Sequence, residues 1–227
     1  MIIGLAGVKQ SGKNTAAKFI SDEFGDEFQI KEWSFAAKLK QSAIAALSGQ
    51  VLSVEDAVIA ADELKTDSEF HGKVFDPAEG EDFVIAEYQF SGREFLQWYG
   101  TEAHRKVFGD DFWVDQVMKD IPDTWGVLPV EEWNGRLDLV TDVRFPNEAI
   151  AITEAGGRVF KITRPDVENT GDTHASEKPL DDELCWCDLL NGGSLDHFKE
   201  LLRPHVKYAI KEMYEGEYGR ITSNAIS

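Results

Sequence analysis

A glycine-containing loop near the start of the chain limits most strongly what the chain can fold into. The residues Gly7-Val8-Lys9-Gln10-Ser11-Gly12-Lys13-Asn14-Thr15 contain the spacing G-x-x-x-x-G-K. The apolar run 2–6 precedes this loop, and small and apolar residues at helical spacing follow it. A buried strand, a glycine loop and a helix in this order predict a phosphate-binding loop, in which backbone N–H groups converge at the N-terminus of the helix.

This predicted loop supplies the candidate cofactor-binding residues, which are Gly7, Lys9, Ser11, Gly12, Lys13, Asn14 and Thr15. The cofactor expected here is ATP, with Lys13 reaching its β and γ phosphates. The hydroxyl that usually follows the lysine directly comes one residue later, at Thr15. This order resembles adenylate kinase and its relatives, and it makes Thr15 a candidate ligand of Mg²⁺. A glycine-rich helix entry that binds no nucleotide is the alternative.

The remaining chain alternates between strand and helix patterns. Apolar stretches predict four further strands, at 29–35, 137–142, 159–163 and 184–190. Helices are predicted at about 36–47 and 146–155, after Ser91, after Asp111 and from Ser194. This alternation favours an α/β fold of the P-loop NTPase class, with a doubly wound, five-stranded parallel sheet. We expect one domain over 1–227, in which 48–120 forms a helical, acceptor-binding insertion.

Candidate catalytic residues stand at the ends of predicted strands. Asp142 ends the third strand, where doubly wound folds place ligand-facing groups, and its carboxylate could hold Mg²⁺ directly or through water. Capping a helix is the alternative role for Asp142. Arg144 and Arg164 carry planar guanidinium groups that suit phosphate oxygens. With Lys13, these three residues form the predicted catalytic set, and no general base is assigned.

Two segments are expected to handle the substrates. The polar segment 164–182 has the length and composition of a mobile lid, which would exclude water from phosphoryl transfer. The stretch 91–115 mixes basic, amide and aromatic groups at helical spacing and could hold a nucleobase and its phosphate. Candidate acceptor-binding residues are Arg93, Gln97, Trp98, Arg105 and Arg144. For Trp98, a place in the core is the alternative.

Charge and cysteine content narrow the partners. The chain has 42 acidic and 23 basic residues, a net charge of −19, so it would repel a nucleic acid polymer. Cys185 and Cys187 are interpreted as reduced core thiols. The apolar start is too short for a signal peptide, and no run has the length of a membrane span. A cytoplasmic protein that acts on small-molecule nucleotides is expected.

Six segments, taken in order, resemble the deoxynucleoside monophosphate kinases of tailed bacteriophages, which are similar to adenylate kinase and dephospho-coenzyme A kinase. These segments are 7–15, 34–40, 96–102, 142–148, 173–177 and 191–194. The resemblance implies transfer of the ATP γ-phosphoryl group to a deoxynucleoside monophosphate, often in a homodimer, and for a phage protein in the host cytoplasm. It also implies that the turn at Asn191 lies near the ATP base. Lys38, within the segment 34–40, is a further candidate acceptor-binding residue.

Several alternatives stay open from the sequence. A P-loop kinase for another small acceptor, such as dephospho-coenzyme A or a nucleoside, would keep the same fold. A nucleotide-binding ATPase that is not a kinase would share the phosphate loop. Residues 48–90 contain no motif shared with the resembling family, so the sequence ranks neither the acceptor bases nor ribose against deoxyribose.

Overall fold

A parallel sheet of five strands carries the phosphate loop. In spatial order the strands are β2 (Gln29–Trp33), β5 (Arg136–Val143), β1 (Ile2–Ala6), β6 (Arg158–Thr163) and β7 (Cys187–Leu190). The prediction of a five-stranded parallel sheet is therefore confirmed. The last strand starts later than the predicted 184–190, because the preceding residues form a 3-10 turn, η5 (Asp182–Leu184), in which the Cys185 N–H donates to Asp182 O at 3.0 Å.

The computed structural model describes the backbone of residues 1–67, 69–76, 80–121, 135–165 and 179–224. It describes the side chains of these residues except 67–90 and 216–224. Two compact units are present, Met1–Phe35 with Val114–Ser227, and Ala36–Trp113. The second unit overlaps the predicted insertion 48–120, whose role in acceptor binding stays a prediction.

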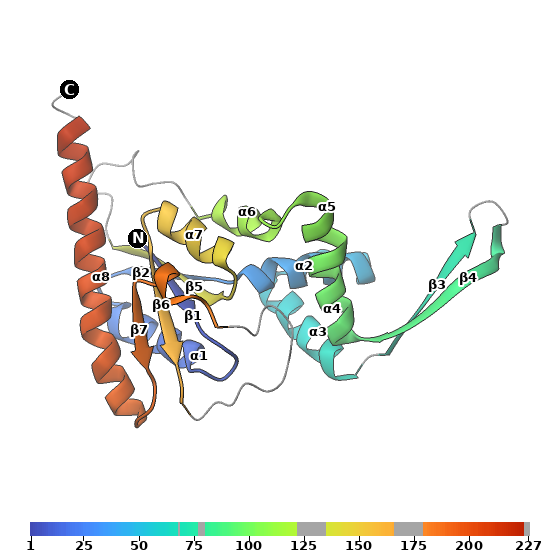
Figure 1. Cartoon of the computed structure of the whole chain (residues 1–227), viewed down its shortest axis with the longest axis horizontal. Helices are drawn as coiled ribbons and strands as arrows, with labels where there is room; N and C mark the ends of the chain where they lie inside the picture. The colour runs from blue at the N-terminus through green and yellow to red at the C-terminus, as the bar shows by residue number, and fades with distance from the viewer. Residues whose placement is uncertain (68, 77–79, 122–134, 166–178, 225–227) are drawn as a thin grey trace. The chain divides into compact units, whose positions relative to one another are not determined.

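Helices cover both faces of the sheet (Figure 1). On one face lie α1 (Lys13–Phe24) and α8 (Leu195–Asn224), which share a core with Ile3 and Leu5 of β1. On the other face α6 (Phe112–Met118) and α7 (Pro146–Glu154) contribute to a second core that includes Ile2 and Ala6. Strand β1 is thus buried on both faces, which explains its continuous apolar sequence.

The second unit combines short helices with a β-hairpin. Its helices are α2 (Phe35–Ser48), α3 (Val54–Asp67), α4 (Gly92–Gly100), the π-helix η1 (Thr101–Arg105) and α5 (Lys106–Phe108). Side chains of α2, α3 and α4 pack together in a small core. An antiparallel hairpin, β3 (Glu69–Asp76) and β4 (Gly80–Ser91), joins α3 to α4 (Figure 1).

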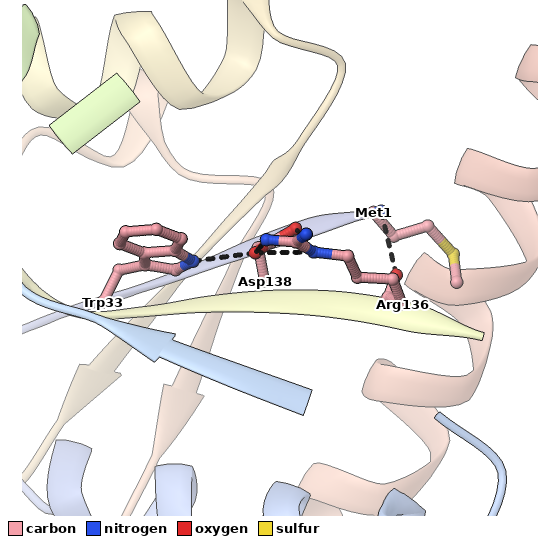
Figure 2. A network of polar contacts seen from close by, with 4 residues as sticks. All are labelled: Met1, Trp33, Arg136 and Asp138. Atoms are coloured by element: carbon pink, nitrogen blue, oxygen red, sulfur yellow. Dashed lines mark hydrogen bonds and ion pairs between the residues drawn. The ribbon is translucent and has the colours of Figure 1, made fainter. Parts of the chain in front are cut away.

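A buried polar network lies at the start of β5 (Figure 2). The carboxylate of Asp138 is 2% exposed and accepts hydrogen bonds from Trp33 Nε1 at 2.7 Å and Arg136 Nη2 at 2.7 Å. The amino group of Met1 donates to Arg136 O at 3.1 Å. Because a buried carboxylate is costly unless it is paired, these contacts are expected to fix the register of β2, β5 and β1 at this end of the sheet.

Candidate active site

The glycine loop connects β1 to α1, as the sequence predicted. Gly7 and Gly12 have φ values of +145° and +112°, which disfavour residues with a side chain. A Cβ at Gly7 would lie 2.5 Å from Ile162 O, and a Cβ at Gly12 would collide with Asn191 Nδ2. Gln10 also has a positive φ, of 66°. The loop is therefore tightly curved and has no room for side chains at the two glycines.

Lys13 fills the centre of this loop. Its ammonium group donates to Gly7 O at 2.6 Å and to Val8 O at 2.8 Å, and the residue is 8% exposed. The loop thus holds a positive charge beside the N-terminus of α1, where backbone N–H groups also favour an anion. This arrangement can bind phosphate groups.

Ser11 provides an independent test of whether a phosphate fits. Its hydroxyl is fully buried and, within the described part of the chain, has no hydrogen-bond partner. The hydroxyl lies inside the loop, because a Cβ at Gly7 would be 2.6 Å from Ser11 Oγ. An unpaired buried hydroxyl is costly, and a phosphate oxygen would satisfy it. The other cofactor candidates, Lys9, Asn14 and Thr15, are exposed.

The strand register brings the predicted catalytic residues to the same edge of the sheet. Ala6 of β1 pairs with Val143 of β5 on one side and with Lys161 of β6 on the other. Asp142 and Arg144, at the end of β5, therefore lie on one side of the loop. Arg164, just after β6, lies on the other side. Arg144 is half-buried and Arg164 is exposed. Carboxyl ends of parallel strands are the usual ligand edge of such sheets.

Asp142 has a clear structural role. Its Oδ1 accepts a hydrogen bond from the Phe35 N–H at 2.8 Å, and its Oδ2 accepts one from the Ser34 hydroxyl at 2.7 Å. Phe35 is the first residue of α2, so the alternative role, capping a helix, is present. Each carboxylate oxygen can accept more than one contact, so capping does not by itself exclude contact with a ligand. Within the described residues, no group of three or more acidic, His or Cys side chains could hold a metal ion.

Glu148 is a site-shaping residue that the sequence reasoning missed. It is 2% exposed, and its Oε2 accepts from the Arg144 N–H at 2.7 Å and the Phe145 N–H at 3.0 Å. These bonds fix the backbone that carries Arg144. The available signal was Pro146 at the first helical position with a glutamate two residues later, which is typical of a helix start.

Asn191 contacts the phosphate loop itself. Its side-chain amide donates to Ser11 O at 2.8 Å, and its backbone N–H donates to Thr163 O at 2.7 Å. The resemblance implied a position near the ATP base. The structure shows contact with the part of the loop expected to bind phosphates.

The remaining acceptor candidates belong to the second unit. They are Lys38 on α2, Arg93, Gln97 and Trp98 on α4, and Arg105 on η1. Trp98 is 55% exposed, so the core alternative does not apply to it. The neighbouring Tyr99 does pack in the core, with its hydroxyl 2.9 Å from Ser42 Oγ.

The π-helix in this unit was also missed. Its spacing changes which carbonyl groups are bonded within the helix. Tyr99 O lies 2.6 Å from His104 Nδ1, and Gly100 O accepts from Trp113 Nε1 at 3.0 Å. These side chains stabilise the turn that carries Arg105. Aromatic residues and a histidine at 99–113 are compatible with an ordinary helix, so the sequence contained no distinct signal for it.

Two comparisons with known proteins each match most of this chain. The family described as deoxynucleotide monophosphate kinase matches residues 36–202. The chain belongs to the deoxynucleotide monophosphate kinase family. A protein of Acanthamoeba polyphaga mimivirus, provisionally named a deoxynucleotide monophosphate kinase, is 30% identical over 182 residues, which cover 79% of this chain and 82% of that protein.

Family membership makes this chain a kinase with a small-molecule nucleotide substrate. It confirms the resemblance to deoxynucleoside monophosphate kinases. The family match starts at residue 36, after the phosphate loop, so the loop geometry and the match are separate observations. The predicted lid, 164–182, falls largely outside the described residues and stays a prediction. None of the described helices is both long and apolar enough to cross a membrane.

Proposed function

We propose that this deoxynucleotide monophosphate kinase transfers the γ-phosphoryl group of Mg-ATP to a deoxynucleoside monophosphate and releases the deoxynucleoside diphosphate. The observation that carries the proposal is the loop 7–15, with Lys13 at its centre and the unpaired Ser11 hydroxyl inside it. A buried donor and an inward ammonium group suit the β and γ phosphates of a nucleotide.

The chemistry needs positioning and charge neutralisation more than covalent help. An oxygen of the acceptor phosphate forms a bond to the γ-phosphorus, and the bond from that phosphorus to the β–γ bridging oxygen breaks, so ADP leaves. The Lys13 ammonium group stays in contact with the β and γ phosphate oxygens during the transfer. Arg144 and Arg164, on opposite sides of the loop entrance, neutralise the charge of the transferring group. The acceptor phosphate is largely a dianion at neutral pH, so no general base is required.

Thr15 and Asp142 are the residues that would hold Mg²⁺. Thr15 lies in the first turn of α1 with its side chain exposed, and Asp142 lies at the carboxyl end of β5. Because both Asp142 oxygens already accept hydrogen bonds, we expect its contact with the ion to pass through water. When bound, the ion neutralises phosphate charge.

We assign the acceptor nucleotide to residues of the second unit, all inside the family match. The exposed indole of Trp98 offers a surface on which a base could stack. Lys38, Arg93 and Arg105 provide positive charge for a monophosphate, and Gln97 provides an amide for hydrogen bonds. Arg144, on the first unit, is a separate candidate for phosphate contact.

An acceptor panel tests the proposal. ADP release would be measured in a coupled assay with each deoxynucleoside monophosphate, the ribonucleotides, dephospho-coenzyme A, nucleosides and no acceptor, and products would be identified by mass. We expect ADP and a deoxynucleoside diphosphate in equal amounts. ADP release that needs no acceptor would instead indicate an ATPase, and activity only with dephospho-coenzyme A or nucleosides would change the acceptor class.

A further inference from the structure

Asn191 reaches the phosphate loop from 180 residues away in the sequence. Its Nδ2 donates to Ser11 O at 2.8 Å, and the same atom would collide with any Cβ at Gly12. The amide group therefore lies directly against the peptide that joins these two loop residues. That peptide immediately precedes Lys13 and the first turn of α1.

The direction of this hydrogen bond sets the direction of the next N–H group. In a trans peptide, C=O and N–H point in opposite directions. Because the Ser11 carbonyl points toward Asn191, the Gly12 N–H points away from Asn191. Such an N–H at the start of a helix can bind an anion, whereas the reversed peptide would present a carbonyl oxygen that repels one. Gly12, with φ of +112°, is flexible enough that both directions are accessible without the side-chain contact.

Asn191 is itself well anchored. Its backbone N–H donates to Thr163 O at 2.7 Å, and Leu190 pairs with Thr163 in the β6–β7 ladder. After the turn, the Ser194 hydroxyl accepts from the His197 N–H at 3.2 Å at the start of α8. Asn191 thus lies between a strand end and a helix start. Because its backbone is anchored there, its side-chain amide can fix the direction of the Ser11 carbonyl.

We propose that Asn191 is a positioning residue for the triphosphate: it holds the Ser11–Gly12 peptide so that the Gly12 N–H faces the phosphates. This inference rests on the proposed function, because it needs ATP phosphates in the loop. It differs from contact with the adenine base in one consequence. A positioning residue affects every ligand that carries the same phosphates, whatever base is attached.

The test uses ATP, GTP and inorganic tripolyphosphate as probes. Calorimetry would measure their binding to the wild type, to Asn191→Ala and to Asn191→Leu, which keeps the volume but removes the donor. Loss of one such hydrogen bond should weaken all three ligands by the same factor, roughly three- to tenfold. The KM for ATP should rise by that factor while the KM for the acceptor stays unchanged. Asp196→Asn, exposed on the first turn of α8, is the control and should bind all three as the wild type does.

If either variant folds poorly, a measurement on the wild-type protein still tests the proposal. In ¹⁵N spectra, tripolyphosphate should shift the Gly12 amide, and the Asn191 side-chain amide should respond equally to ATP and GTP. Weakening confined to ATP, or no weakening at all, would overturn the role of Asn191. If Lys13→Ala also left tripolyphosphate binding unchanged, the phosphate loop assignment would fail as well, and the two failures are therefore distinguishable.

Discussion

The carboxylate of Asp142 accepts a hydrogen bond of 2.8 Å from the backbone N–H of Phe35, a residue 107 positions earlier in the chain. Asp142 therefore stabilises the start of α2 while it stands at the ligand edge of the sheet. Asp142 therefore has a structural role in addition to the role in the site that we propose for it. Substitutions at this position must be designed to separate the two roles.

Asp142→Asn should separate them. Asparagine keeps an oxygen for the Phe35 N–H, so unfolding in urea should change little, whereas Asp142→Ala should cost about 1–2 kcal/mol. Both variants should lose activity, and Asp142→Asn should recover part of it at high Mg²⁺ because the ion stays on ATP but is poorly placed. An unchanged Mg²⁺ dependence for Asp142→Asn would make Asp142 purely structural.

Lys13→Ala should lower kcat by about three orders of magnitude, because it removes a charge from the β and γ oxygens in the site. Steady-state kinetics and circular dichroism would measure activity and fold. Lys18→Ala is the matched control, since Lys18 lies on the same helix in an exposed ion pair with Asp22 at 3.1 Å. Near-normal kcat for a folded Lys13→Ala would contradict the role of the loop.

Arg164→Lys should lower kcat more than it weakens ATP binding. The change keeps the charge but removes the planar, two-pronged donor that suits a transferring phosphoryl group. Arg158→Lys, at the opposite end of β6, is the control and should leave kcat unchanged. Rapid-quench kinetics would report the transfer step directly. Equal effects of the two substitutions would place Arg164 outside the reaction.

Asp138→Ala should destabilise the fold without changing the ATP-dependent steps. It leaves Trp33 Nε1 and the Arg136 guanidinium without their shared acceptor (Figure 2). Because Arg136 is about one-third exposed and can regain water, we expect a loss of about 2 kcal/mol rather than the larger cost of a fully buried pair. Urea unfolding would measure it, and a loss of activity at full folding would contradict a purely structural network.

Both thiols should react slowly in the folded protein. Burial raises the pKa of Cys185 from 9.0 to about 11 and that of Cys187 from 9.0 to about 12. Labelling with a disulfide reagent at pH 8 should therefore be about tenfold or more slower than in urea. Because the folded pKa values are raised, their contribution to stability is complete below pH 9 and is lost as the pH rises toward 11–12. Equal labelling rates would contradict this.

Local patterns were sufficient to predict β1, the glycine loop and α1. The run 2–6 is apolar because both faces of β1 are buried, and α1 follows the helical spacing of its buried residues. Glycines were informative as well, since Gly7 and Gly12 occupy positions with positive φ where a side chain would collide. In each case the physical constraint acts within a few residues, so the sequence shows it directly.

Other features depend on contacts between distant residues. The bond from Asn191 to Ser11 spans 180 residues and that from Phe35 to Asp142 spans 107, so no local pattern specifies either. The β3–β4 hairpin was missed because the segment around it is rich in acidic residues that weaken its strand pattern. Short periodic signals cannot separate such segments from loops.

The central position of β1 in the sheet leaves this strand exposed while the rest of the chain is being translated. It is made first, yet both of its partners come much later, β5 at Arg136–Val143 and β6 at Arg158–Thr163. The first neighbouring strand is complete only at Val143 and the second only at Thr163, so the apolar side chains of β1 have no native strand beside them until more than half of this sequence has been translated. Nascent chains of this length expose such segments to aggregation. Fragments stalled before residue 136 should therefore bind chaperones, and release from them should begin only once both neighbouring strands have left the exit tunnel.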